Sequence, residues 1–158
     1  MDLLPLFEWL EATTIGELVR GSTWVFPVIE SLHLLALAVL GGIVLLVNFR
    51  LLGLGLRQPV AELAAGTHRW LVVSVMVAIV SGVPLFLSEA VKCYYSGPFW
   101  IKMEALALAV LFTFTVWRNV TRAGESRYGA IWRSTVGVVS IVLWATVAWG
   151  GRWIGFAG

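Results

Sequence analysis

The sequence predicts an all-α polytopic membrane protein, with four transmembrane helices in an up-down bundle preceded by an N-terminal interfacial amphipathic helix. Hydrophobic residues make up 59% of the chain and charged residues 13%, whereas a soluble domain carries about 25% charged residues. Four apolar stretches each approach the roughly 20 residues that a helix needs to cross about 30 Å of hydrocarbon. These observations define one transmembrane domain over residues 1–158, in contact with the lipid bilayer.

The N-terminal segment is too short and too charged to cross a bilayer. Leucine and tryptophan side chains alternate with glutamates over about residues 4–19, which predicts a helix lying at the membrane interface. Acidic residues precede the first basic one, Arg20, so the segment does not resemble a signal peptide. We therefore expect it to belong to the mature protein.

The four spans are expected over about residues 24–49, 70–90, 99–117 and 134–154. Pro27 falls in the first turn of the first span, where a missing backbone N–H is tolerated. Pro84 lies near the far end of the second span and predicts a kink there. The short connections favour neighbouring antiparallel helices.

Basic residues indicate the orientation of the chain. The two loops on one side carry seven of them and the other side carries four, so the positive-inside rule places both termini outside the cytoplasm. Because they occur singly or in pairs, they do not form the basic patch that nucleic acid requires. Tryptophans at the proposed span ends are typical of an interfacial belt.

Glu30 and His33 are ionisable residues inside the first span. They are three residues apart, so a helix places them on one face, and His33 lies roughly 13 Å below Trp24. Such groups are costly in lipid unless they are paired or functional. The topology brings three further charged residues to the same end of the bundle: Lys102, Glu104 and Arg152.

Three interpretations of this cluster remain open. Glu30 and Lys102 could form a buried ion pair that only fixes helix register. Alternatively, His33 is the metal ligand of a b-type haem, with Lys102 or Arg152 beside its propionates. A third interpretation is a proton or ion path that uses Glu30, as in a small proton-coupled transporter or channel.

A haem could not use both histidines of the chain. His33 and His68 would lie roughly 26 Å apart along the bundle, whereas two axial nitrogens stand only about 4 Å apart. The second ligand would then be Met103, Lys102, a vacant position, or His33 of a second chain.

Other residue patterns point away from catalysis. The sequence contains no hydrolase triad, phosphate loop or zinc spacing, and Cys93 has no activating base nearby. No catalytic residue is therefore assigned, and we do not expect a stand-alone enzyme. Gly41 and Gly42 are interpreted as close-packing positions between helices, with a ligand-facing role as the alternative.

Several motifs resemble a group of small bacterial four-span membrane proteins known only as a domain of unknown function. The resemblance covers nearly the whole chain and implies a multi-pass protein of the bacterial inner membrane. Where that group would carry Asp-x-Arg, this chain has Asn48 before Arg50. The motifs are Trp24-x-x-Pro27-x-x-Glu30-x-x-His33, Asn48-Phe49-Arg50-Leu51-Leu52-Gly53, Ser81-Gly82 with Phe86, Phe99-x-x-Lys102 and Gly151-Arg152-Trp153-Ile154.

His33 and the Phe99-x-x-Lys102 entry to the third span are also distantly similar to HemJ-type protoporphyrinogen oxidases and CopD-like membrane proteins. This similarity implies haem or redox chemistry. The leading hypothesis is a b-haem-binding, redox-linked membrane protein, acting in electron transfer or as an accessory subunit. We expect a homo-oligomer or a subunit of a larger complex, and the rival hypothesis is a structural or assembly subunit without cofactor.

Overall fold

The computed structural model describes residues 3–55 and 57–155, with the backbone alone for residues 124–126. Four helical segments are long and apolar enough to cross a membrane: Val25–Leu51, Val60–Ser88, Gly97–Ala123 and Ala130–Ile154. The chain is therefore an integral membrane protein with an all-helical fold. Its elements are α1 (Leu4–Glu11), α2 (Thr14–Gly21), α3 (Val25–Leu51), α4 (Val60–Ser88), α5 (Ala90–Tyr95), α6 (Gly97–Phe112), a π-helical turn η1 (Thr113–Trp117), α7 (Arg118–Arg127) and α8 (Ala130–Ile154).

The predicted boundaries differ from the structure by a few residues at several span ends, and more at two places. The N-terminal segment 4–19 is divided between α1 and α2, because Thr13 caps α2 by accepting a hydrogen bond from the Gly16 amide at 3.4 Å. The helix of the second span begins at Val60, ten residues before the predicted Trp70. Its first turns carry charged residues, which mark the limit of the apolar region without interrupting a helix.

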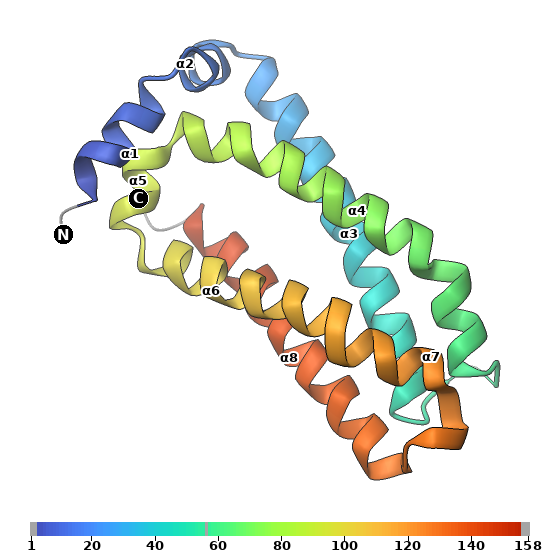
Figure 1. The fold of residues 1–158 in the computed structure, drawn as a ribbon. Coiled ribbons are helices and arrows are strands. Elements are labelled where there is room, and N and C mark those ends of the chain that lie inside the picture. Colours follow the sequence, from blue (N-terminus) through green and yellow to red (C-terminus); the bar gives the residue numbers. More distant parts are fainter. Residues whose placement is uncertain (1–2, 56, 156–158) are drawn as a thin grey trace.

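The four spans form two antiparallel helix hairpins. The chain runs up and down as predicted, and α3 packs along α4 while α6 packs along α8. The hairpins join through α3 with α8 and α4 with α7. Figure 1 shows that α4 and α6 diverge from this junction toward α1, α2 and α5. We call the end with α7 and residues 52–55 and 57–59 the basic end, and the end with α1, α2 and α5 the capped end.

A buried polar network joins the hairpins toward the basic end. Asn48 on α3 is fully buried; its amide nitrogen donates to Ser140 Oγ at 2.9 Å, and its carbonyl oxygen accepts from Trp117 Nε1 at 2.8 Å. Trp144 Nε1 donates to Thr113 Oγ1 at 3.1 Å. Thr113 and Trp117 are the first and last residues of η1, so the π-helical turn supplies both contacts from the third span.

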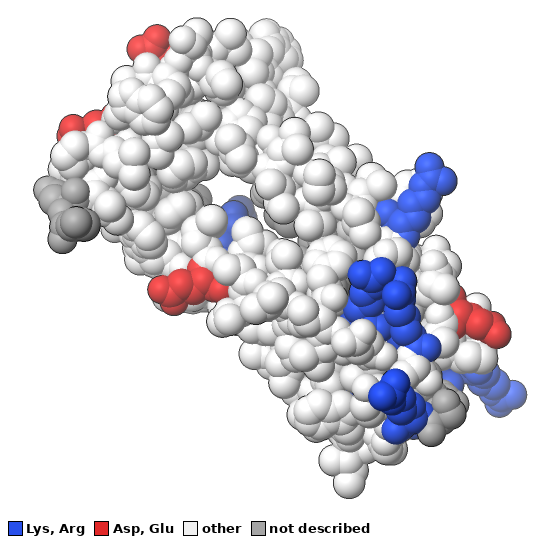
Figure 2. Space-filling view, in the orientation of Figure 1, with Lys and Arg blue, Asp and Glu red and all other residues white. Residues whose placement is uncertain are grey.

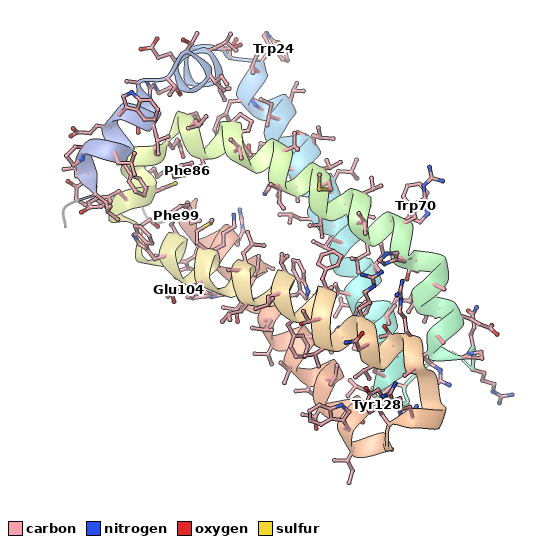
Figure 3. The ribbon with its side chains drawn as sticks, in the orientation of Figure 1. Trp24, Trp70, Phe86, Phe99, Glu104 and Tyr128 are labelled. Atoms are coloured by element: carbon pink, nitrogen blue, oxygen red, sulfur yellow. The ribbon has the colours of Figure 1, made fainter. Side chains whose placement is uncertain are left out.

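An aromatic cluster closes the capped end. Phe86 of α4 stacks on Phe99 of α6 with ring centroids 5.5 Å apart, and Figure 3 shows these two residues at the ends of their helices. Phe7 of α1 contacts Phe86, Tyr94 and Trp100 at centroid distances of 5.7, 5.2 and 5.8 Å. Helix α1 is thus held against both hairpins by aromatic contacts.

Close helix approaches occur at different glycines from those predicted. A Cβ added at Gly41 or Gly42 would meet no atom within 4 Å, so the predicted packing of these residues against another helix of the chain is wrong. The close approach between α3 and α8 is instead at Gly137, where a Cβ would lie 3.3 Å from Cβ of Leu51. Spacing alone did not show which glycines face another helix.

Gly16 allows α2 to pack directly on the end of α4. An added Cβ would lie 2.6 Å from the Leu87 carbonyl oxygen and 2.7 Å from that of Glu11, and both are backbone atoms. We expect Gly16→Ala to lower the free energy of unfolding by about 1–3 kcal/mol, because α2 must move away from α4. Thermal unfolding in detergent measures this change.

Gly21 provides the matched control, because it lies in the same helix and an added Cβ there meets no atom within 4 Å. Gly21→Ala should therefore leave the unfolding midpoint close to that of the unchanged protein. Equal midpoints for both variants would contradict the close α2–α4 contact.

Candidate functional site

A hollow separates the two hairpins between the basic end and the capped end. Figure 2 shows the opening between the α3–α4 pair and the α6–α8 pair, with a blue basic side chain visible inside it. The buried apolar side chains form one cluster around the helix junction and a second cluster around Phe7, Ala90, Cys93 and Phe99. The hollow lies where neither cluster fills the space between the hairpins.

His33 is half-buried on α3, about 12 Å from the start of the helix. Its Nδ1 lies 3.0 Å from Ser81 Oγ, and the Ser81 hydroxyl donates to the Val77 carbonyl at 2.6 Å. Because that hydroxyl proton is already used, Ser81 accepts the hydrogen bond from His33. The proton is therefore assigned to Nδ1, and Nε2 carries the lone pair of the neutral ring.

Small residues on α4 make room for this ring. A Cβ added at Gly82 would lie only 3.2 Å from Cε1 of His33. The Ser81 hydroxyl and Gly82 both lie beside the Nδ1–Cε1 edge of the ring. Helix α4 thus fixes both the position of the imidazole and the nitrogen that carries its proton.

Lys102 is half-buried on α6 and lies against α8. A Cβ added at Gly150 would stand 2.9 Å from Cβ of Lys102, and one added at Gly151 would stand 3.5 Å from its Nζ. The glycine pair therefore provides the space in which the lysine side chain lies. The ammonium interacts electrostatically with His33, which belongs to the opposite hairpin.

Lys102 has no counter-charge within the part of the chain that the structure describes. The ion pairs found there join Arg20 to Glu11 at 2.8 Å and Lys92 to Glu89 at 3.9 Å. The ion pair between Glu30 and Lys102, one of the three interpretations of the sequence, is not among them. An ammonium inside a span is costly without a partner.

His33 and Lys102 are both half-buried and lie on opposite hairpins, and the other predicted residues are more exposed. Glu30 is exposed on α3, Met103 is 42% exposed on α6, and Arg152 is exposed near the end of α8. Glu104 is also exposed and projects from the side of α6 that faces away from α4 (Figure 3).

The structure supports the sequence argument that His33 and His68 cannot share one iron. His33 contacts Ser81, which lies 13 residues beyond His68 on the same helix, or about 20 Å along its axis. His68 is half-buried nearer the basic end.

Three residues at the site were missed by the sequence analysis as contact residues: Ser81, Gly82 and Gly150. Ser81 and Gly82 are part of the motifs that carry the family resemblance, and Gly150 lies within the predicted fourth span. Small residues among large apolar ones were the available signal. It did not show that these positions hold the two ionisable side chains.

Cys93 on α5 is a buried free thiol near the capped end. Burial raises its pKa to about 11; the nearby Glu89 carboxylate adds to the rise, and Lys102 opposes it. The thiol is therefore protonated at neutral pH, and we expect the folded protein to react slowly with maleimide. The labelling rate should rise about tenfold per pH unit until the pH approaches about 11.

The same protein unfolded in detergent at neutral pH is the control and should label rapidly. A half-maximal labelling rate near about pH 8.5 in the folded protein would contradict the effect of burial on this thiol.

The arrangement offers one nitrogen ligand and one cation rather than a metal centre built from side chains alone. Within the described ranges, no group of three or more histidine, cysteine, aspartate or glutamate residues is placed to hold a metal ion. The lone pair of His33 Nε2 can bind one coordination position of an iron, and Lys102 can bind an anionic group. A histidine ligand together with a lysine cation therefore suits a ligand that already contains both a metal ion and a carboxylate.

Comparison with known proteins gives a family but no activity. A model of DUF6644, a family of unknown function, matches residues 6–157, which include all four spans. No curated protein and no solved structure matches the chain. The distant similarity to HemJ-type and CopD-like proteins therefore stays an expectation from the sequence.

Proposed function

Because the chain belongs to this family of unknown function, its activity has to be inferred from its own residues, and we propose that it binds a b-type haem between its two hairpins. The observation that carries the proposal is that two half-buried residues lie on opposite hairpins: His33, oriented by Ser81, and Lys102, which has no counter-charge among the described residues. His33 would bind the iron through Nε2, and Lys102 would bind a propionate.

The chemistry of these residues fits such a group. His33 donates its Nδ1 proton to Ser81, and a histidine oriented in this way presents Nε2 as a ligand of fixed direction. Lys102 supplies a positive charge that lacks a partner among the described residues, and a propionate would neutralise it. The apolar side chains of the spans would exclude water from the macrocycle.

A bound haem would supply one-electron chemistry, which makes the protein redox-linked. The residues described here would hold and orient the group. We therefore propose a role in electron transfer, or as an accessory subunit of a larger membrane complex or a homo-oligomer.

The proposal includes an orientation in the bacterial inner membrane. Seven arginines gather toward the basic end, several of them visible as blue side chains in Figure 2. The positive-inside rule puts that end in the cytoplasm and the haem site in the outer half of the bilayer. The seven are Arg50, Arg57, Arg69, Arg118, Arg122, Arg127 and Arg133.

The decisive test is the absorption spectrum of protein produced with adequate haem and extracted under mild conditions. The proposal expects a Soret band together with bound iron. A colourless, iron-free protein that also fails to bind added haemin would refute the proposal and favour a structural or assembly subunit.

Lys102→Met is expected to weaken haem retention by about tenfold, because it removes the charge that binds a propionate but keeps the length of the side chain. Haem titration followed at the Soret band measures the affinity. Lys92→Met is the matched control, since Lys92 lies outside the spans and is paired with Glu89. Equal losses in both variants would count against a role for Lys102.

A further inference from the structure

The hollow is closed at both of its ends along the bundle axis. Toward the capped end, the stacked rings of Phe86 and Phe99 join α4 to α6, and Phe7 of α1 covers them. Toward the basic end, the Asn48 network and the α3–α8 contact close the space between the hairpins. Among the described residues, these contacts join the two hairpins beyond each end of the hollow.

The side of the hollow is open. Helices α4 and α6 belong to different hairpins and do not pack along each other. Figure 2 shows the opening between them on the surface of the spans, which is the surface that faces lipid. A ligand can therefore reach the hollow from the bilayer without separating any packed pair of helices.

Lys102 indicates the chemistry of that ligand. It lies about 8 Å from the start of α6, and no carboxylate pairs with it in the described part of the chain. The carboxylate of a membrane amphiphile sits near the interface while its apolar body lies in the hydrocarbon region. The positive charge of Lys102 and its depth in the membrane therefore match the carboxylate headgroup of an amphiphile whose apolar body lies deeper in the bilayer.

From these observations we infer that the hollow is a lateral binding site that takes a carboxylate-bearing amphiphile directly from the bilayer through the opening between α4 and α6. The inference rests on the proposed function only in treating haem as one such amphiphile.

A photoreactive probe tests the inference in proteoliposomes. The probe is a 16-carbon fatty acid with a diazirine in its chain, added to vesicles that contain the haem-free protein. After illumination, we expect labelled peptides from α4 and α6 next to the hollow, with labelling at least about tenfold lower in Lys102→Met. Lys92→Met should label like the unchanged protein.

A second probe keeps the test independent of any variant. The same chain and diazirine with a trimethylammonium headgroup should not label the hollow, because Lys102 repels it. Labelling that is equal for both headgroups, or unchanged in Lys102→Met, would overturn the inference.

Access from the side is tested by tethering the capped end. Cysteines replace Phe86 and Phe99 in a Cys93→Ser background, and a short bifunctional thiol reagent joins them. Fatty-acid labelling should change by less than about twofold between the tethered and untethered forms. A loss of about tenfold or more on tethering would show entry past the aromatic cluster and overturn lateral entry.

Haemin competition separates this inference from the proposed function. If haemin abolishes fatty-acid labelling, the two ligands share the hollow, as both proposals expect. If labelling depends on Lys102 but haemin neither competes nor gives a Soret band, the lateral site stands and the proposed function fails. If haemin binds while fatty-acid labelling is independent of Lys102, the proposed function stands and the lateral site fails.

Discussion

His33→Ala is expected to abolish the Soret band of protein prepared with haem. The imidazole is the one predicted iron ligand that the structure orients, through its 3.0 Å contact with Ser81. Without it, Lys102 could bind a propionate but would not hold the iron. The measurement is the absorbance ratio of the Soret band to the protein band after purification in the same detergent.

His68→Ala is the matched control for this experiment, because it removes the other histidine of the chain at a position about 20 Å away along α4. It should retain the band. Ser81→Ala should retain a band but lower the affinity about 10–100-fold, since it frees the orientation of the ring. A full band in His33→Ala would show that the iron ligand lies elsewhere.

Asn48→Ala is expected to produce the largest loss of stability among single substitutions of polar residues, about 2–5 kcal/mol. The change removes both hydrogen bonds of a fully buried side chain and leaves Trp117 Nε1 and Ser140 Oγ without this partner. It also leaves a cavity where three spans meet. Thermal unfolding in detergent, followed by tryptophan fluorescence, measures the shift in midpoint.

Asn119→Ala is the control, because Asn119 is an exposed asparagine on α7. This substitution should change the free energy of unfolding by no more than about 0.5 kcal/mol, as is typical of surface positions. Its unfolding midpoint should therefore stay close to that of the unchanged protein. A similar small effect of Asn48→Ala would mean that the network contributes little to joining the hairpins.

Hydropathy was sufficient to predict the fold class. Four apolar stretches predicted four spans, and the structure has four helical segments of sufficient length and hydropathy at those places. The second helix begins ten residues before its charge-free apolar run at Trp70, because residues 60–69 are helical but carry charged residues. The break at Thr13 was missed because a capping hydroxyl can end one helix and begin the next within a few residues.

The candidate site was only partly predictable. Depth and topology were enough to place His33 and Lys102 at the same end of the bundle. Their placement on opposite sides of a hollow depends on the angle at which the hairpins diverge, which side-chain packing determines over the whole length of the helices. Asn48 was identified only through a resemblance, because a single polar residue in an apolar run does not indicate its partners.

The pairing of spans that are neighbours in sequence has a consequence for biogenesis. Each hairpin consists of two consecutive spans, so it can insert and pack before the rest of the chain is complete. We expect the joining of the hairpins to follow and to depend in part on the Asn48 network, since lipid provides no hydrophobic force between helices. Substitutions there would leave correctly inserted but unjoined halves, which protease digestion of the connecting loops would release as separate fragments.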